Sequence, residues 1–433
     1  MLDVILSMQD RTNPNSPLVN YRISIDDIPL IHKYMEMLHM RKNHLVFSIL
    51  AGAILKKDEK EQGITIIKKT KNISDYVVVE EIYSKFKLDK EEPLSGETMK
   101  KFLKINENFD QSSYDIIYRS KKRTSYFILK PKNIFRIDLT TTRTSNNISK
   151  LPSSLVNYEI EIECEIKDKN TFINELFDVI QLIIKCVQGS NYIVTKSISN
   201  LVLNKYQDIL AVNKSRTNLY GRQPISLEVQ HVVDYLPNRY AVTDKADGDR
   251  YFMIVVDSRC YLISSNLIVK DTGINIDKKY DKSIIDGEFV FLSKYNRYIY
   301  MAFDCLTMGE INVRDESKFM TRLIYLDEII QAINKTKFQY KNLEKANIDF
   351  NNIDKVIEFH LNNMIEFYDD IDKELNTKST SILFRRKYFI PANGIQDNEI
   401  FKYINFMWKN ITTNNKVKCP YLHDGLILQP LEQ

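Results

Sequence analysis

The sequence predicts a two-domain α+β protein in which both domains are built mainly from antiparallel strands. Residues 19–165 contain many short segments in which apolar and polar residues alternate, as they do in half-buried strands. A helical pattern follows at 170–212, and strand-like segments resume over 240–306. Polar residues 213–224 separate the two parts, and we expect them to link two domains.

The length and composition agree with this organisation. A chain of 433 residues holds two or three domains, and we place them at 1–212 and 225–433. Its 43% hydrophobic and 27% charged residues are typical of a soluble protein with sizeable cores. The net charge of +4 is small, so any contact with nucleic acid must come from local basic clusters.

The cysteines and the N-terminus exclude several classes of protein. The five cysteines are odd in number and form no C-x-x-C pair, which argues against a zinc site or a disulfide framework and favours a reducing compartment. The N-terminus has no basic leader before an apolar run, and no apolar run reaches membrane-spanning length. We therefore expect a chain that is not secreted and has no membrane partner.

The individual elements follow from the local patterns. The alternating segments predict first-half strands at 19–25, 64–69, 76–86, 114–129, 134–140 and 158–166. Apolar spacing predicts helices at 26–42 and 170–212. The expected second-half strands are 240–245, 250–257, 259–265, 284–292 and 297–306. Residues 318–376 are mostly helical in pattern, with an Asn/Asp-rich loop at 342–354.

Three first-half strands carry charges of complementary sign on one face. The segment 158–166 aligns Glu159, Glu161 and Glu163, because alternate residues of a strand share a face. By the same rule 119–128 aligns Arg119, Lys121, Arg123 and Ser125, and 136–140 aligns Arg136, Asp138 and Thr140. Any one strand is explained by a solvated outer face. Three together favour a closed barrel whose interior binds a polyanion and a metal.

The second half opens with 240-YAVTDKADGDRYFMIV-255, where charged residues lie between two apolar runs. A glycine after the strand allows a sharp turn, which places Lys245 near one strand end and Arg250 at the start of the next. A lysine among apolar neighbours and near another cation can have a lowered pKa and act as a nucleophile. A charged hairpin explains this segment alone equally well.

Three later segments favour the nucleophile. The stretch 285-IDGEFV-290 pairs Asp286 with Glu288 on one strand face. Period-2 alternation in 298-YIYMAFDCL-306 puts Tyr300, Ala302 and Asp304 on one face, where an aromatic ring suits a stacked base. The stretch 421-YLHDGLILQP-430 carries Asp424 into an apolar strand.

Taken in order, these segments resemble the covalent nucleotidyltransferases, which include mRNA capping guanylyltransferases and ATP-dependent ligases. KADGDR, DGEF, YMAFD and DGLI are similar to the family's motifs I, III, IIIa and IV. The segments NRYAVTDKADG and NGIQDNEIFKYINFMWK look most like capping enzymes of giant DNA viruses, of the mimivirus type. The resemblance implies an ATP-grasp-like ligase or capping domain.

The resemblance also implies roles for individual residues. Lys245 would attack the α-phosphate of GTP to form a lysyl-N-GMP. The implied nucleotide contacts are Arg250 and Glu288 at the ribose, Tyr300 stacked on the guanine, and Asp247. Asp424 and Asp304 would lie near a divalent metal, Mg²⁺ or Mn²⁺, and the lysine.

The first half resembles the metal-dependent RNA triphosphatases that have a tunnel-shaped β-barrel. In that family two glutamate strands bind a metal, and water then removes the RNA γ-phosphate. Glu159, Glu161 and Glu163 match one of these strands and are the implied metal ligands. The residues that match the basic and tunnel strands, and are implied to bind the triphosphate, are Arg119, Lys121, Arg123, Arg136 and Asp138.

Two departures from the family pattern are visible. No E-x-E lies within a predicted strand before Glu159, since Glu59 and Glu61 precede the strand expected at 64–69, and after Asp424 the chain reads only GLILQPLEQ, without the lysine pair of motif V or an OB fold. We therefore expect the sequence to be short of the family pattern at both ends. The resemblance further implies the 5′ end of nascent mRNA as partner, a cap methyltransferase domain or subunit, and a place in the host cytoplasm (the viral factory) or the virion.

Two alternative functions stay open at this stage. An ATP-dependent RNA or DNA ligase shares motifs I to IV, although the charged barrel argues against it. A catalytically incomplete RNA-binding fragment of a capping enzyme fits the missing motif V and glutamate strand. Labelling of the protein by GTP, by ATP or by neither distinguishes the three.

Overall fold

The computed structural model consists of two compact units, Met1–Ile184 and Lys185–Gln433, and each is described by itself. The residues that it describes are 1–8, 18–26, 28–29, 31–32, 36, 64–71, 76–87, 90–93, 115–234, 239–335, 352–377, 382–413 and 416–432. Most of the helix expected at 26–42 lies outside them. None of the described helices is both long and apolar enough to cross a membrane.

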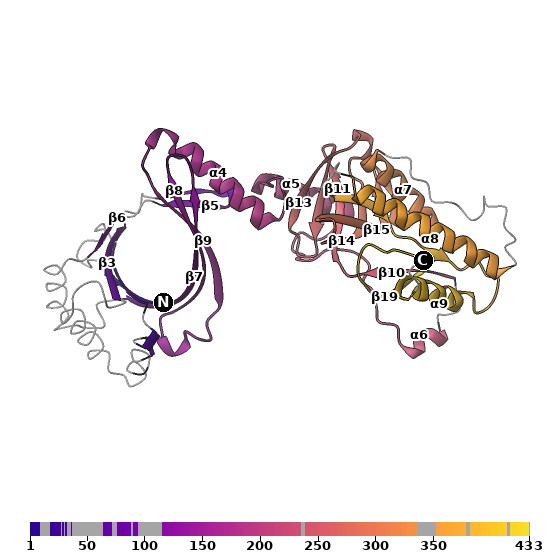
Figure 1. Cartoon of the computed structure of the whole chain (residues 1–433), viewed down its shortest axis with the longest axis horizontal. Coiled ribbons are helices and arrows are strands. Elements are labelled where there is room, and N and C mark those ends of the chain that lie inside the picture. The colour runs from indigo at the N-terminus through magenta and orange to yellow at the C-terminus, as the bar shows by residue number, and fades with distance from the viewer. Residues whose placement is uncertain are drawn as a thin grey trace. The chain divides into compact units, whose positions relative to one another are not determined.

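The first unit is built on a curled antiparallel sheet with the strand order β6-β3-β2-β1-β7-β8-β9 (Figure 1). Its strands are β1 (Leu2–Met8), β2 (Leu18–Ile25), β3 (Ile64–Lys71), β6 (Lys90–Pro93), β7 (Asp115–Leu129), β8 (Ile134–Ser145) and β9 (Val156–Glu165). Helix α4 (Lys169–Gln188) packs on the outside of the curl. There Val179 of the helix meets Phe135 and Ile137 of β8. The alternate residues of β8 and β9 therefore face the inside.

The segment 76–86 is not the single strand that its pattern predicts. It forms a two-stranded sheet of β4 (Tyr76–Val79) and β5 (Ser84–Lys87). A 3-10 turn at Glu80–Ile82 and a left-handed Tyr83 (φ 51°) reverse the chain between them. The expected helix at 170–212 is also divided. Gly189 (φ 58°) ends α4, and the side chain of Thr195 accepts from the N–H of Ile198 to cap α5 (Lys196–Leu210).

The second unit contains two sheets. The larger has the order β13-β12-β11-β14-β15-β16, and β17 joins β15 in parallel. Its strands are β11 (Asp249–Val256), β12 (Arg259–Ser264), β13 (Val269–Asn275), β14 (Ile284–Leu292), β15 (Arg297–Met308), β16 (Ile311–Asn312) and β17 (Ile382–Arg386). The smaller, ordered β18-β10-β19, consists of β10 (Tyr240–Ala246), β18 (Ile390–Pro391) and β19 (His423–Pro430).

Helices cover both sheets of the second unit. Its remaining helices are α6 (Val229–Asp234), α7 (Phe319–Asn334), α8 (Ile353–Leu375) and α9 (Glu399–Thr412). Helices α8 and α9 share a core with Val242 of β10 and Val290 of β14, whereas α7 packs against Met253 and Tyr300 on the other side of the large sheet. The described residues thus form a mixed α+β protein with curled antiparallel sheets, as the strand patterns predict.

The division between the units does not lie where the composition placed it. Helix α5 belongs to the second unit, because Val202 and Tyr206 pack against Phe252 and Ile254 of β11. The polar segment 213–224 also packs there: Leu219 is buried, and its N–H donates to the Ser265 carbonyl at 3.2 Å. The segment is therefore part of the second unit rather than a free linker. Because the segment is otherwise polar, its composition did not indicate that Leu219 is buried.

Candidate active site

Lys245 and Asp424 meet across the pair of strands β10 and β19. Asp244 pairs with Leu426 and Ala246 with His423, so an irregularity in the register brings the two residues side by side. The Lys245 Nζ lies 2.6 and 2.7 Å from the two Asp424 carboxylate oxygens. The hydrogen bond from Lys245 lowers the pKa of Asp424. The charge nearest to the lysine is thus an anion, not the cation that the sequence suggested.

The turn after Lys245 depends on a glycine. A Cβ on Gly248 would lie 2.6 Å from Cγ2 of Val290, which is too close for any side chain. The glycine therefore allows a close approach of strands and not only a turn. Asp247 lies in the same turn. Its N–H donates to the Leu422 carbonyl at 2.8 Å, and its side chain is exposed to solvent.

Arg250 and Asp286 form a bidentate ion pair on neighbouring strands. The Arg250 Nε lies 3.0 Å from Oδ1 and its Nη2 2.6 Å from Oδ2 of Asp286. Complete burial raises the pKa of Asp286 to about 6, although Arg250 opposes that shift. Arg250 is held rigidly on β11, where the sequence placed it.

A pH dependence of stability follows from Asp286. Because its folded pKa is above the unfolded value, the folded state holds the proton more tightly, and stability falls as pH rises between about 4 and about 6. Compared with Asp286→Asn, the unsubstituted chain should lose about 2–3 kcal/mol of unfolding free energy across that window. Urea unfolding of both chains at pH 4, 5 and 6 measures this. A constant difference between them would contradict it.

Glu288 bonds a lysine that the sequence analysis missed. Lys387 follows β17, is fully buried, and its Nζ lies 2.5 Å from Glu288 Oε2 and 2.9 Å from the Asp244 carbonyl oxygen. The Asp244 carboxylate is 4.0 Å from the same Nζ. Burial raises the pKa of Glu288, and Lys387 counteracts it. Lys387 therefore links β14 to the strand that carries Lys245.

The expected stacking role of Tyr300 is wrong for this structure. Tyr300 is 0% exposed, and its hydroxyl donates to the carbonyls of Tyr251 and Ile285 inside the core. The half-buried ring that faces the site is Phe303, which lies 5.9 Å from the Arg250 guanidinium and 6.0 Å from the Lys387 Nζ. Phe303 is the better candidate for base stacking.

A β-bulge explains the difference. Asp286 pairs with Asp304 and Gly287 with Ala302, so Phe303 is the extra residue of β15. Regular alternation therefore fails at this point. The Asp304 carboxylate instead pairs with the buried Arg322. Its Oδ1 accepts a hydrogen bond from the Arg322 Nε at 2.9 Å, and its Oδ2 accepts one from Nη2 at 3.3 Å. The structure does not bring Asp304 to Lys245 or Asp424, contrary to expectation.

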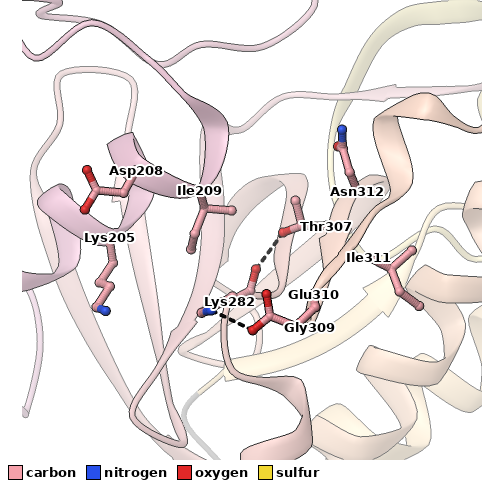
Figure 2. Close-up of a pocket in the computed structure, with 9 residues that line it drawn as sticks. All are labelled: Lys205, Asp208, Ile209, Lys282, Thr307, Gly309, Glu310, Ile311 and Asn312. Atoms are coloured by element: carbon pink, nitrogen blue, oxygen red, sulfur yellow. Dashed lines mark hydrogen bonds and ion pairs between the residues drawn. The ribbon is translucent and has the colours of Figure 1, made fainter.

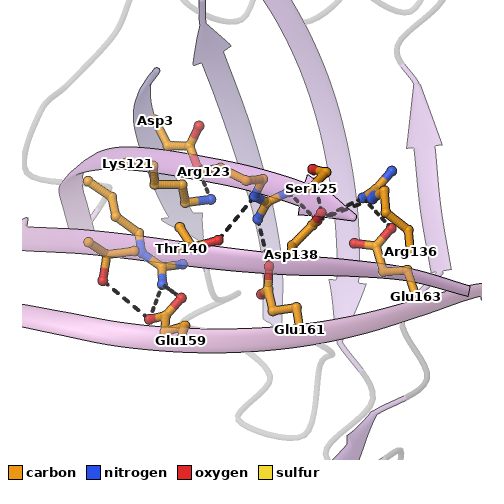
Figure 3. Close-up of polar contacts among 12 residues, drawn as sticks. Asp3, Lys121, Arg123, Ser125, Arg136, Asp138, Thr140, Glu159, Glu161 and Glu163 are labelled. Atoms are coloured by element: carbon orange, nitrogen blue, oxygen red, sulfur yellow. Dashed lines mark hydrogen bonds and ion pairs between the residues drawn. The ribbon is translucent and has the colours of Figure 1, made fainter. Parts of the chain in front are cut away.

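The charged residues of the first unit lie together inside the curl. Ser125 of β7 pairs with Asp138 of β8, which in turn pairs with Glu161 of β9. In the next inward-facing row, Arg136 of β8 pairs with Glu163 of β9. Figure 3 shows these side chains converging from three strands. Arg123 Nη2 lies 2.6 Å from Glu161, and Arg136 Nη2 lies 2.6 Å from Glu163.

Three of these carboxylates are close enough to hold one cation. Oxygens of Asp138, Glu161 and Glu163 lie within 4.8 Å of one another. Burial opposes ionisation of Asp138, but hydrogen bonding from Ser125 and the charges of Arg123 and Arg136 lower its pKa. Hard carboxylate oxygens at this spacing fit Mg²⁺ or Mn²⁺.

This carboxylate cluster differs by one member from the predicted ligands Glu159, Glu161 and Glu163. Glu159 accepts from Arg119 and, at 3.3 Å, from Thr142, whereas Asp138 takes its place in the carboxylate cluster. Lys121 forms a buried ion pair with Asp3 of β1. Asp3 was not predicted, because it belongs to no E-x-E pattern. It is a carboxylate of the N-terminal strand on the same inner face.

One further polar hollow lies in the second unit, between α5 and the turn that joins β15 to β16 (Figure 2). Lys282 and Glu310 pair across it at 2.6 Å, and Thr307 donates to the Lys282 carbonyl. It contains none of the residues predicted for nucleotide binding.

Comparison with known proteins places this geometry in context. Residues 187–403 match the family model described as mRNA capping enzyme, catalytic domain. This range lies entirely within the second unit, and it contains Lys245, Arg250, Glu288 and Lys387 but stops before Asp424.

Several viral proteins are similar to the chain. A probable mRNA-capping enzyme of Acanthamoeba polyphaga mimivirus is 32% identical over 339 residues, which cover 76% of this chain and 27% of that protein. An mRNA-capping enzyme of African swine fever virus is 24% identical over 212 residues, 46% of this chain and 24% of that protein. The chain therefore spans about a quarter of the length of these curated relatives.

Solved structures of the mimivirus capping enzyme triphosphatase also align with the chain. One is 25% identical, with a TM-score of 0.32, and the alignment covers 42% of this chain and 73% of that one. A second, monoclinic structure is 26% identical with the same TM-score and covers 72% of that chain.

Proposed function

The chain belongs to the mRNA capping enzyme family through its catalytic domain, and from this we propose that its second unit transfers GMP from GTP to RNA through Lys245. The observation that carries the proposal is the contact of Lys245 with Asp424, beside Arg250 and Phe303. An amine, a carboxylate, a fixed cation and an aromatic ring are what a covalent nucleotide transfer needs.

The proposed reaction has two steps. In the first, the neutral Lys245 amine attacks the GTP α-phosphorus, a P–N bond forms, and the bond to the bridging oxygen breaks to release pyrophosphate. The ammonium first loses its proton to solvent, and Asp424, whose pKa Lys245 lowers, stays ionised and orients Nζ toward the phosphorus. In the second, a terminal oxygen of the RNA 5′-diphosphate attacks the phosphorus and restores the lysine. A divalent cation, when bound, would neutralise phosphate charge near Asp424.

We infer that the first unit removes the RNA γ-phosphate before that transfer. Asp138, Glu161 and Glu163 would hold a divalent cation, Mg²⁺ or Mn²⁺. The inward cations Arg119, Lys121, Arg123 and Arg136 would bind the phosphate chain in exchange for their present carboxylate partners. Water would attack the γ-phosphorus, and the RNA diphosphate would leave with phosphate as the second product. In this proposal the curled sheet closes into a barrel around the triphosphate, and the second unit is ATP-grasp-like.

The triphosphatase proposal is tested with the carboxylate cluster. The double substitution Glu161→Gln, Glu163→Gln should lower phosphate release from 5′-triphosphate RNA by about 100-fold or more, because two of three metal ligands lose their charge. Phosphate release is measured with Mg²⁺ and with Mn²⁺.

The matched control is Asp178→Asn, which removes a carboxylate from the exposed side of α4. It should leave phosphate release unchanged. Equal rates in the cluster variant and the control would contradict the assignment of the first unit, and would leave that of the second standing.

Partners and place of action follow from the same proposal. The substrates are GTP and the 5′ end of nascent mRNA, and a cap methyltransferase would use the product. The viral origin of the similar proteins supports action in a host-cell viral factory or in the virion. The ligase alternative predicts labelling by ATP in place of GTP, and the incomplete-fragment alternative predicts labelling by neither.

A further inference from the structure

The ring of Trp408, on helix α9, lies beside the residue that precedes Asp424. It meets the ring of His423 edge to face, with the centroids 6.3 Å apart and the planes at 89°. His423 pairs across the strands with Ala246, the residue after Lys245. Trp408 is 44% exposed, so much of its ring is open to solvent. An aromatic surface therefore begins one residue from the carboxylate that bonds the proposed nucleophile.

Helix α9 exposes a second ring on the same side. Phe401 lies seven residues before Trp408, which places both on one helix face, and it is 40% exposed. The helix is already anchored through its other face, where Ile400, Tyr403 and Met407 join a core with β10 and β19 (Figure 1). Aromatic rings that share an exposed face favour a role in binding over a role in packing.

The surface around these rings is basic. From residue 400 to residue 423 the sequence has no aspartate or glutamate, and its four lysines are Lys402, Lys409, Lys416 and Lys418. The acid at the start of α9, Glu399, is buried and accepts the N–H groups of Asn393 and Gly394. The whole chain has a net charge of only +4. This stretch is therefore a local basic cluster of the kind that contact with nucleic acid requires.

Exposed aromatic rings beside lysines fit single-stranded RNA in particular. Unpaired bases stack on aromatic side chains, and lysines neutralise the phosphates between them. A duplex hides the faces of its bases in its own stack, and an acidic peptide has no base to stack. The acceptor of GMP must also bring its 5′ end to Lys245, whose Nζ bonds Asp424 at the edge of this surface.

We propose that α9 and the segment leading to Asp424 form the docking surface of the acceptor RNA, whose first unpaired bases stack on Trp408 while Lys409 binds a phosphate. The inference rests on the proposed transfer of GMP and adds where the acceptor lies. The groups assigned to GTP, Arg250 and Phe303, lie on the large sheet instead. The docking surface should therefore act in the second step of the reaction and not in the first.

The two steps are measured separately in the full chain. The first is formation of the lysyl adduct from GTP and its reversal by pyrophosphate. The second is transfer of GMP from the isolated adduct to a short single-stranded RNA with a 5′-diphosphate. Trp408→Ala should raise the RNA concentration needed for half-maximal transfer by about tenfold, the effect of losing one stacked base. Formation and reversal of the adduct should stay unchanged, whereas a structural defect would impair both steps.

Three more variants define the interaction. Trp408→Phe keeps an aromatic ring and should retain most of the RNA affinity. Lys409→Gln should weaken RNA binding for every sequence and lower the slope of log affinity against log salt by about one. Phe291→Ala is the matched control, because Phe291 is 50% exposed on β14 of the same unit. It should behave like the unsubstituted chain in both steps.

Fluorescence tests the surface without any reaction, because Trp408 is the chain's only tryptophan. Single-stranded RNA with a 5′-diphosphate should quench it in a saturable way. A blunt duplex of the same length should need an about tenfold higher concentration, since its bases are already stacked.

The outcomes separate the two levels of the proposal. If RNA leaves the fluorescence unchanged, or if Trp408→Ala transfers GMP like the unsubstituted chain, the inference is overturned. It is also overturned if Trp408→Ala slows both steps by one factor, or if it only dissociates a dimer seen by light scattering, which would make the surface a contact between copies. Saturable quenching in a chain that forms no adduct would refute the proposed transfer and support the docking surface.

Discussion

Replacement of Lys245 by alanine is expected to abolish the GTP-dependent label on the protein, a loss of at least about 1000-fold in the rate of adduct formation. No other described amine bonds Asp424, so none stands ready to take over the attack. The lysine and Asp424 side chains are 42% and 54% exposed, and an exposed ion pair contributes little to folding. The label should therefore vanish while the thermal midpoint stays nearly unchanged.

Two controls make this result specific. Lys245→Arg keeps a cation beside Asp424 but has no nucleophilic amine, so it should be as inactive as alanine. Lys279→Ala removes a lysine that is 63% exposed elsewhere in the unit, and should label normally. Labelling of Lys245→Ala at an undiminished rate would show that another residue is the nucleophile.

The second large effect is expected at Lys387. Lys387→Met should destabilise the second unit by about 3–5 kcal/mol, because it leaves Glu288 and Asp244 buried without their cation. Trp408, the chain's only tryptophan, lies on α9, so its fluorescence reports unfolding of this unit in urea. Adduct formation should be lost together with stability.

A paired substitution distinguishes the charge from the packing. Adding Glu288→Gln to Lys387→Met removes one unpaired charge and should restore part of the lost stability. If the single variant unfolds within about 1 kcal/mol of the unsubstituted chain, the buried charge network does not hold β14 to β10.

The sequence is informative where its patterns are regular. Apart from the divided segment 76–86, the predicted strands lie close to their expected bounds, since alternation depends only on one face being buried. The inward rows of β7, β8 and β9 come together as predicted, because strands in register align equivalent faces. Lys245, Arg250 and Asp424 are positioned by local motifs, and the resemblance to capping enzymes is confirmed by the family match.

What could not be predicted depends on tertiary structure. The bulge at Phe303 reverses the alternation of β15, so that side chains after it point to the opposite face from the one predicted. Nothing in the sequence YMAFD signals this bulge. Lys387 lies in the basic run FRRKYF, which is typical of a solvated surface, but the fold buries it against Asp244 of β10 and Glu288 of β14. Asp3 is a single carboxylate in an apolar strand, and only its pairing with β7 brings it to Lys121. The boundary between the units was predicted wrongly for a similar reason, because only tertiary packing shows that α5 belongs to the second unit.

The central claim is that Lys245 forms a covalent bond to GMP, and mass spectrometry of the intact chain tests it most directly. After incubation with GTP and Mg²⁺ or Mn²⁺, we expect one added GMP, which peptide mapping assigns to Lys245 and which added pyrophosphate removes. No adduct, an adduct on a different residue, or an adduct formed from ATP but not from GTP would contradict the claim.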